Sequence, residues 1–199
     1  MNQTIAYRIN DNLYLNITDR CTLTCKFCPK TQGIKRVHDF DLTLEQRPEI
    51  ESIIESIGNP REYDSIVFCG FGEPTLRLKV LLTVARHIKK ERGKVRINTD
   101  GLANLFHKRN VLPDFEGLVD ALSVSLNGQN ETIYNQHCQP ALKGSFNAVL
   151  DFLRLAPRYV PEVTASAIHG LEGLDIEACS ALAKQLGVGF RQRNLDVVG

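Results

Sequence analysis

Strand-like and helix-like segments alternate along this chain, and this alternation restricts the fold more than any other feature of the sequence. Short runs rich in β-branched and apolar residues lie at 13–17, 65–69, 95–99, 121–126, 163–168 and 188–192. Patterns with helical periodicity lie at 50–57, 78–90, 102–108, 145–153 and 176–186. The alternation predicts an α/β fold in which right-handed helical crossovers join the strands of a parallel sheet.

The number of strands predicts how far such a sheet closes. The 199 residues fall short of the roughly 250 that are typical of a barrel with eight β/α units. We therefore expect an incomplete (β/α)6 TIM-like barrel that forms a single domain over residues 1–199, with no repeat or linker. The active site should lie at the carboxyl ends of the strands, where the loops of such barrels gather.

Composition and charge exclude several classes of function. Apolar residues make up 43% of the chain, and 24 Lys and Arg residues nearly balance 23 Asp and Glu residues, so no nucleic-acid footprint is evident. The first residues lack the basic and apolar blocks of a signal peptide. No apolar run approaches the ~18 residues that a membrane span requires. We expect a cytoplasmic protein without membrane contact, whose thiols stay reduced.

Three of the six cysteines lie within eight residues, directly after the first predicted strand. Cys21, Cys25 and Cys28 have the spacing C-x3-C-x2-C. In a reducing compartment such a group indicates metal binding or catalysis, not disulfides. Thiolates are the usual ligands of iron–sulfur clusters. Because a closed cluster needs four ligands, three cysteines would leave one iron open for chemistry.

Structural zinc is the alternative interpretation of the same cysteines. A structural zinc site normally uses two ligand pairs, such as a C-x2-C pair with a second Cys or His pair downstream. His38 is the nearest later histidine, and no second pair is present. A small zinc-binding interaction module nevertheless remains the alternative from a different functional class.

The cysteine motif, with the aromatic Phe27 before its last cysteine, resembles that of the radical S-adenosylmethionine (SAM) superfamily. This resemblance implies a [4Fe–4S] cluster on Cys21, Cys25 and Cys28, with SAM chelated to the open iron. It further implies reductive cleavage of SAM to a 5′-deoxyadenosyl radical, which abstracts hydrogen from a substrate. An electron donor such as flavodoxin or ferredoxin would supply the reducing electron.

Further segments after the predicted strands resemble motifs of the same superfamily. Residues 70–74 read Gly-Phe-Gly-Glu-Pro, and 98–101 read Asn-Thr-Asp-Gly. Glycine allows close backbone approach, and a carboxylate can pair with the SAM ammonium group. Such segments also occur as plain turns and helix caps. The cofactor-binding residues that the resemblance implies are Phe27, Gly72, Glu73, Pro74, Asn98, Ser125, Asn127, His169 and Arg191.

Within the superfamily, the segments 15–21, 70–77, 96–104 and 123–127 resemble most closely the TatD-associated radical SAM family. This resemblance implies a possible association with a TatD-type hydrolase and does not identify the substrate, which we expect to be a small molecule or a peptide or protein side chain. Enzymes like 7-carboxy-7-deazaguanine synthase or a glycyl-radical activase are the alternatives within the superfamily.

The remaining cysteines have less certain roles. Cys138 could face the substrate as a hydrogen donor or be a small buried residue. We expect Cys69 to pack in the sheet, Cys179 to pack in the core, and His137 to lie in a surface loop.

Overall fold

Alternation of buried and partly buried residues gives each central strand two different faces. In β6 (Val95–Thr99), Val95, Ile97 and Thr99 are buried, whereas Arg96 and Asn98 between them are partly exposed. Successive side chains of a strand point to opposite faces of the sheet. One face of the sheet is therefore apolar and the other polar. These features come from a computed structural model that describes residues 3–195; the first two and the last four residues lie outside the description.

The strands are β1 (Ala6–Ile9), β2 (Asn12–Leu15), β3 (Arg36–Val37), β4 (Phe40–Asp41), β5 (Ser65–Phe68), β6, β7 (Ala121–Ser125), β8 (Glu162–His169) and β9 (Gly189–Asn194). The α-helices are α1 (Ile50–Ile57), α2 (Leu78–Lys90), α3 (Ala103–His107), α4 (Glu131–Cys138), α5 (Ser145–Leu155) and α6 (Ile176–Gln185). Four short 3-10 helices are η1 (Pro60–Glu62), η2 (Pro74–Arg77), η3 (Leu112–Phe115) and η4 (Ala156–Arg158).

The main sheet has the strand order β1-β2-β5-β6-β7-β8-β9. From β2 to β9 every neighbouring pair is parallel, which confirms the six predicted parallel strands. β1 is an additional edge strand that pairs antiparallel with β2. A tight turn joins these two strands, and Asn10 in this turn has a φ of 52°, a conformation that Asn tolerates better than most residues.

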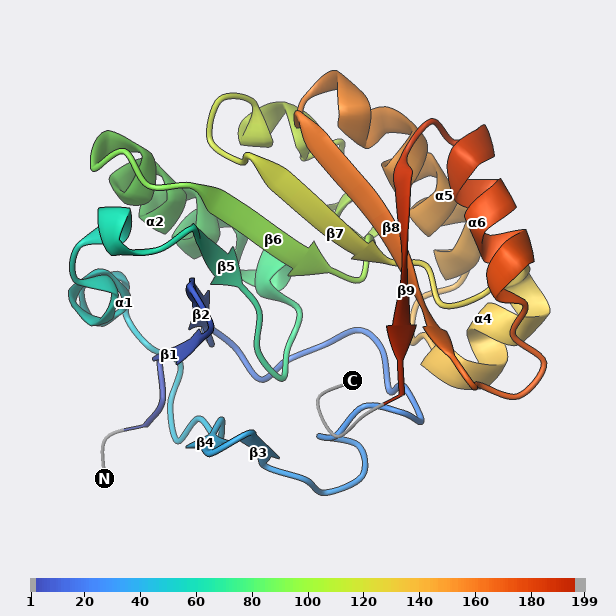
Figure 1. The fold of residues 1–199 in the computed structure, drawn as a ribbon, viewed down its shortest axis with the longest axis horizontal. Coiled ribbons are helices and arrows are strands. Elements are labelled where there is room, and N and C mark those ends of the chain that lie inside the picture. The colour runs from blue at the N-terminus through green and yellow to red at the C-terminus, as the bar shows by residue number, and fades with distance from the viewer. Residues whose placement is uncertain (1–2, 196–199) are drawn as a thin grey trace.

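The helices cover the apolar outer face of the curved sheet (Figure 1). Buried side chains from helices α1, α2 and α5, such as Ile53, Leu81 and Phe152, belong to the same core cluster as Ile97 and Val124 of the strands. The segment from β2 to β4 runs along the other side of the sheet, opposite the helices (Figure 1). The inner, polar face of the sheet is thus left facing this segment. Within residues 3–195, no helix combines the length and apolar character that crossing a membrane would demand.

Candidate cofactor site

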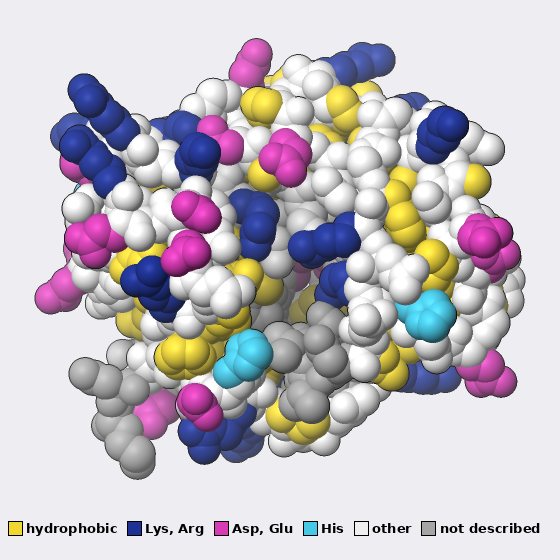
Figure 2. Space-filling view, viewed as in Figure 1, with side chains coloured by type: hydrophobic (Ala, Val, Ile, Leu, Met, Phe, Trp, Pro, Cys, Tyr) yellow, Lys and Arg dark blue, Asp and Glu magenta, His cyan; other side chains and the backbone are white. Residues whose placement is uncertain are grey.

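The polar inner face of the sheet borders a cavity of about 380 Å³. Neighbouring strands contribute a row of side chains to this face, because Ser125 of β7 pairs with Ser166 of β8, and Ser166 pairs with Arg191 of β9. In the space-filling view, Lys and Arg side chains border the recess at the centre of the molecule (Figure 2). Arg191 and Arg193 line the cavity. The inside of this partial barrel is therefore a binding space and not a packed core.

Most of the residues predicted from the sequence to bind a cofactor or metal line this one cavity. They are Cys21, Cys25, Phe27, Cys28, Gly72, Glu73, Asn98, Ser125, Asn127 and Arg191. Two predicted residues do not line it. Pro74 is buried at the start of η2, and His169 is exposed at the end of β8. Segments separated by about 170 residues in sequence thus meet at one site, at the predicted end of the strands.

A close backbone approach at Gly72 positions the start of the cysteine loop, which comprises residues 19–30. A Cβ atom at Gly72 would lie 2.4 Å from the Thr18 carbonyl oxygen and 2.6 Å from the Arg20 carbonyl oxygen. The next residue reinforces this contact, because the Glu73 amide donates a hydrogen bond to the Arg20 carbonyl oxygen (2.8 Å). Only glycine fits between these atoms. The glycine motif therefore packs against the cysteine loop and fixes its start, in addition to any contact with a ligand.

The middle of the cysteine loop is held by the end of α4. The Lys26 amide donates to the His137 carbonyl oxygen (2.9 Å), and the Thr24 amide donates to that of Cys138 (3.2 Å). The Ala141 amide donates in return to the Thr22 carbonyl oxygen (2.9 Å). The first two bonds use carbonyl groups that the end of α4 leaves without intrahelical partners. α4 was missed in the sequence, and with it the main support of the loop.

The buried end of α4 corrects the expectation for His137 and agrees with one of the two alternatives for Cys138, that of a small buried residue. His137 is buried instead of lying in a surface loop, and its Nε2 atom is 2.8 Å from the Glu172 carbonyl oxygen. Cys138 is fully buried and does not line the cavity. It therefore does not face the cavity, and its thiol adjoins that of Cys25.

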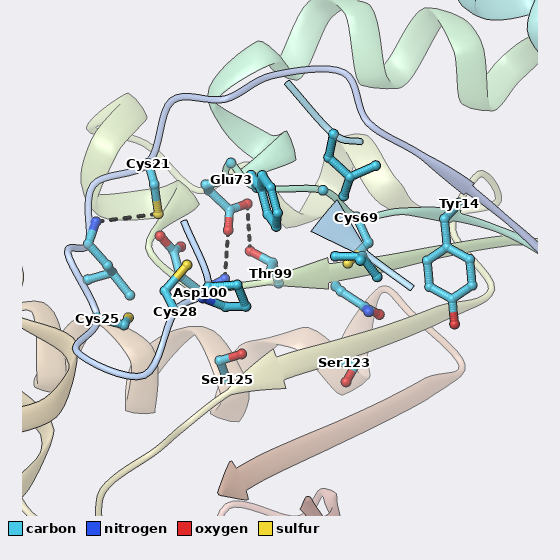
Figure 3. Close-up of a pocket in the computed structure, with 18 of the residues that line it drawn as sticks. Tyr14, Cys21, Cys25, Cys28, Cys69, Glu73, Thr99, Asp100, Ser123 and Ser125 are labelled. Atoms are coloured by element: carbon cyan, nitrogen blue, oxygen red, sulfur yellow. Dashed lines mark hydrogen bonds between the residues drawn. The ribbon is translucent and has the colours of Figure 1, made fainter. Parts of the chain in front are cut away.

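The three clustered cysteines lie at one end of the cavity, beside Glu73 and Asp100, whereas Tyr14 lies at the other end (Figure 3). The three cysteines are free thiols. The hydrogen bond with Cys138, together with burial, raises the pKa of Cys25, and burial with the nearby Asp100 and Glu73 raises the pKa of Cys21. Within residues 3–195, no three His, Cys, Asp or Glu side chains are already gathered in a metal-binding arrangement. The raised pKa values of Cys21 and Cys25 favour the protonated form of these two thiols.

Two buried carboxyl groups adjoin the thiols. Glu73 Oε1 accepts hydrogen bonds from the Thr75 amide (3.0 Å), the Thr75 hydroxyl (2.6 Å) and the Thr99 hydroxyl (2.9 Å). Its Oε2 accepts from the Asp100 amide (2.7 Å). Burial and the nearby Glu73 raise the pKa of Asp100 well above its usual value. Glu73 therefore joins the loops after β5 and β6, and the two acids make this end of the cavity suitable for cationic groups.

Two amide oxygens supply open acceptors for a ligand. Asn98 Oδ1 and Asn127 Oδ1 are buried and have no hydrogen-bond partner within the described part of the chain, and both residues line the cavity. Buried polar atoms are nearly always paired, so such atoms indicate a ligand or water. Asn127 also has a φ of 45°, an uncommon left-handed conformation that Asn can adopt. These oxygens, the three thiols and the acidic pair fit a polar cationic ligand beside a thiolate-bound metal group.

Several cavity residues were not predicted. Tyr14, Ser166 and Arg193 line the cavity. Cys69 also lines it, and its amide donates a hydrogen bond to the Leu15 carbonyl oxygen (3.1 Å), in agreement with the expectation that it packs in the sheet. Burial raises the pKa of Cys69, whereas a hydrogen bond from Asn98 and the charges of Arg96 and Arg193 lower it. A signal was available for Ser166, because Thr164 and Ser166 alternate with apolar residues in β8 and so mark its inner face.

The model of the radical SAM superfamily matches residues 15–186, which include the cysteine loop and the parallel strands β5 to β8. The chain belongs to the radical SAM superfamily. This membership implies a [4Fe–4S] cluster and SAM as cofactors, which confirms the predicted enzyme class at the level of the superfamily. It favours the iron–sulfur interpretation of the cysteine loop over zinc.

Curated relatives carry different activities. The chain is 36% identical over 98 residues to GTP 3′,8-cyclase of Peptoclostridium acidaminophilum, which is 48% of this chain and 28% of that protein. It is 31% identical over 166 residues to GTP 3′,8-cyclase of Limosilactobacillus fermentum, covering 81% and 43% of the two chains. The dual-specificity RNA methyltransferase RlmN of Buchnera aphidicola is 26% identical over 145 residues, with coverage of 67% and 39%. The chain thus spans less than half the length of these relatives.

Solved structures share the fold. SuiB of Streptococcus suis bound to the precursor peptide SuiA gives a TM-score of 0.68 at 11% identity, covering 94% of this chain and 39% of that one. TYW1 with a lysine-pyruvate adduct gives 0.66 at 14% identity, covering 92% and 64%. At such identities the likeness shows the fold alone. It confirms the predicted α/β partial barrel of the radical SAM type.

Proposed function

We propose that this chain is a radical SAM enzyme that binds a [4Fe–4S] cluster through Cys21, Cys25 and Cys28. The observation that supports this most directly is that all three thiols line one cavity next to buried, unpaired acceptor atoms. Thiolates are the usual ligands of such clusters. Cysteine binds iron as the thiolate, so cluster assembly would require Cys21 and Cys25 to lose their protons. The positive charge of iron would favour this thiolate form, which the surroundings of Cys21 and Cys25 disfavour.

We assign the SAM-binding roles to the other residues of the cavity wall. The backbone around Gly72, Glu73 and Pro74 would receive the ammonium group beside the two buried acids. Asn98, Ser125 and Asn127 offer amide and hydroxyl groups for the ribose, and Arg191 offers a guanidinium for the carboxylate. Phe27 would pack beside the cofactor. His169 stays a prediction from the sequence, since it is exposed and outside the cavity wall.

When bound and reduced, the cluster supplies the electron that cleaves SAM to a 5′-deoxyadenosyl radical, and this radical chemistry belongs to the cofactors. The protein supplies position. Gly72 and the end of α4 fix the cysteine loop, and Glu73 fixes the loop after β6.

Finer assignments are also proposals. We propose that the chain is a single-domain member of the TatD-associated branch, which acts in the cytoplasm on a small molecule or a peptide or protein side chain. The four segments that resemble this branch support the proposal, and an association with a TatD-type hydrolase follows from it. Affinity purification of the chain from cells that also produce a TatD-type hydrolase tests this association. Absence of the hydrolase from the purified material would contradict it.

Anaerobic reconstitution with iron and sulfide tests the enzyme assignment. We expect a brown protein that absorbs at about 400 nm, as thiolate-bound iron does. It should release 5′-deoxyadenosine when it is reduced in the presence of SAM. The Cys25→Ala variant should take up no stable cluster. Cys179→Ala is the matched control, because Cys179 is buried in α6 away from the cavity. A colourless zinc protein, or equal cluster loss in both variants, would overturn the assignment.

A further inference from the structure

The end of the cavity that contains Tyr14 lies opposite the clustered cysteines (Figure 3). A small hydrophobic cluster, separate from the main core, supplies a wall of the cavity together with the residues packed against it. The rings of Tyr7 and Tyr14 are stacked there, with 5.4 Å between their centroids and 24° between their planes. Such a wall suits a flat apolar group. Its members that line the cavity are Tyr7, Ile9, Tyr14, Val37, Leu42 and Phe71.

Tyr14 also presents a polar group at this end. The Arg96 Nη2 atom donates a hydrogen bond to the Tyr14 hydroxyl oxygen (3.2 Å), and the guanidinium carbon lies 5.9 Å from the centroid of the Tyr14 ring. Because the hydroxyl oxygen accepts this bond, the O–H proton of Tyr14 stays available to donate to a ligand. A hydroxyl donor beside a guanidinium group favours a negatively charged acceptor.

Arg96 carries a positive charge that no ion pair found within residues 3–195 compensates. Its Nε atom is buried and has no hydrogen-bond partner in this part of the chain. Arg96 lies on the same face of β6 as Asn98, which lines the cavity, because side chains two residues apart in a strand share a face. A buried N–H donor of this kind indicates a ligand or water.

Arg193 contributes a second positive charge, and it lines the cavity from the edge strand β9. Burial raises the pKa of Cys69, and the charges of Arg96 and Arg193 oppose this rise, so both guanidinium groups lie within electrostatic reach of Cys69. Cys69 adjoins the aromatic wall, because the Tyr7 hydroxyl donates to its carbonyl oxygen (3.3 Å). Two positive charges thus act on the region between Cys69 and Tyr14.

The two ends of the cavity differ in charge. Among the described residues that line it, the carboxyl groups are those of Glu73 and Asp100, and both lie beside the cysteines (Figure 3). This acidic end suits the cationic groups of SAM, whereas positive charges at the other end repel them. The Tyr14 end therefore favours a different ligand, one with a negative charge.

We infer that the Tyr14 end of the cavity is the substrate subsite, and that it binds a ligand with an anionic group, a carboxylate or a phosphate, on a flat apolar body. The inference rests on the proposed function, because it names the class of substrate for the same cavity. The Tyr14 hydroxyl, Arg96 and Arg193 would hold the anionic group, and the rings of Tyr7 and Phe71 would contact the apolar body. Charge-assisted hydrogen bonds are stronger than neutral ones, so the anionic group would set the orientation of the substrate.

Calorimetric titration of the reconstituted holoprotein in the presence of SAM tests this inference with three small probes. Benzoate and phenyl phosphate carry an anionic group on a ring, and benzamide is the neutral isostere of benzoate. We expect the wild type to bind at least one of the two anions about tenfold more tightly than benzamide, a difference of about 1.4 kcal/mol. Tighter binding of phenyl phosphate than of benzoate would assign the phosphate class, and the reverse order would assign the carboxylate class.

Two variants in the subsite should reduce this preference for an anion. Arg96→Gln removes the charge, and Tyr14→Phe removes the hydroxyl donor but keeps the ring, so each should lower the preference to about threefold or less. The affinity of Tyr14→Phe for benzamide should stay within about twofold of wild type, because the apolar contact is retained. Arg86→Gln is the matched control, since it removes one positive charge at an exposed position of α2 that does not line the cavity. It should bind all three probes within about twofold of wild type.

Equal wild-type affinity for the three probes, an unchanged preference in both subsite variants, or an equal loss in Arg86→Gln would each overturn the inference. Loss of SAM affinity in Arg96→Gln with an unchanged preference for the anion would assign this arginine to the cofactor and would also overturn it. Cluster content and 5′-deoxyadenosine release of the wild type are measured separately. If both are present, these failures leave the proposed function intact. A protein that takes up no cluster would overturn the proposed function, whereas the preference for an anion could still be measured on the apoprotein.

Discussion

The close approach at Gly72 predicts that Gly72→Ala disrupts the cysteine loop. The new Cβ atom would meet three backbone atoms, namely the carbonyl oxygens of Thr18 and Arg20 at 2.4 and 2.6 Å and the Arg20 nitrogen at 2.8 Å. An ordinary Cβ contact is 3.4–4 Å. Because backbone atoms cannot move aside by a rotamer change, the segment before Cys21 must shift by about 1 Å.

The expected cost follows from this overpacking. Inserting a methyl group into a well-packed region typically costs about 1–3 kcal/mol. For a chain of this size, each kcal/mol lowers the melting temperature by about 2–4 °C. The shift also moves Cys21 relative to Cys25 and Cys28, so we expect cluster content to fall at least about twofold, since ligand position governs metal affinity.

Thermal unfolding of the apoprotein and iron and sulfide analysis after reconstitution measure the two effects. Gly189→Ala is the matched control, because the nearest atom to a Cβ at Gly189 is the Thr164 hydroxyl at 3.3 Å, and the φ of this residue lies outside the left-handed region. We expect this control to stay within about 0.5 kcal/mol of wild type. Wild-type stability and cluster content in Gly72→Ala would refute the reasoning.

Three further predictions concern the groups around the cysteines. Glu73→Gln should lower the free energy of unfolding by about 1–3 kcal/mol, because the carboxamide cannot accept all four hydrogen bonds; urea titration measures this, and an unchanged value would contradict it. Cys138→Ala should retain the cluster, since Cys138 contacts Cys25 but lies outside the cavity wall; iron loss would identify Cys138 as a fourth ligand. In the apoprotein, the pKa of Asp100 is raised, so the folded state keeps a proton that the unfolded state releases above pH ~4. The free energy of unfolding should therefore fall as the pH rises toward that raised pKa. In urea titrations between pH 5 and 8, the free energy of unfolding of Asp100→Asn should fall less with pH than that of the wild type. Parallel pH profiles for the two proteins would refute this assignment.

The fold could be predicted because most of its strands have a local sequence pattern that identifies them. The segment 95–99 was predicted as a strand from its apolar alternation, and β6 has these bounds. β1 was missed because it is a four-residue edge strand with little apolar periodicity. The turn at Asn10 and Asp11, residue types that favour tight hairpins, was the available signal. α4 was missed because its apolar face is weak, and its position depends on contacts with the distant cysteine loop.

The site could be predicted as a set of residues but not as a set of contacts. Motif spacing predicted that Cys21, Asn98 and Asn127 belong to one site, and all three line one cavity, since the carboxyl ends of parallel strands converge. Their role in cofactor binding stays a prediction. Spacing alone gave no sign that Glu73 is saturated by hydrogen bonds from its own chain. It also gave no sign that Cys69 would line the cavity, because Cys69 follows the last residue of β5, where the strand's alternation no longer fixes the direction of a side chain.

The hydrogen bonds between the cysteine loop and residues 137–141 impose an order on biosynthesis. Residues 21–28 emerge from the ribosome early, but the carbonyl groups of His137 and Cys138 and the amide of Ala141 that hold them emerge more than 100 residues later. At a typical rate of about 5–20 residues per second, the loop waits several seconds for this support. During that interval its thiols are unprotected, so iron loading is best suited to a chain that has been completed at least through Ala141.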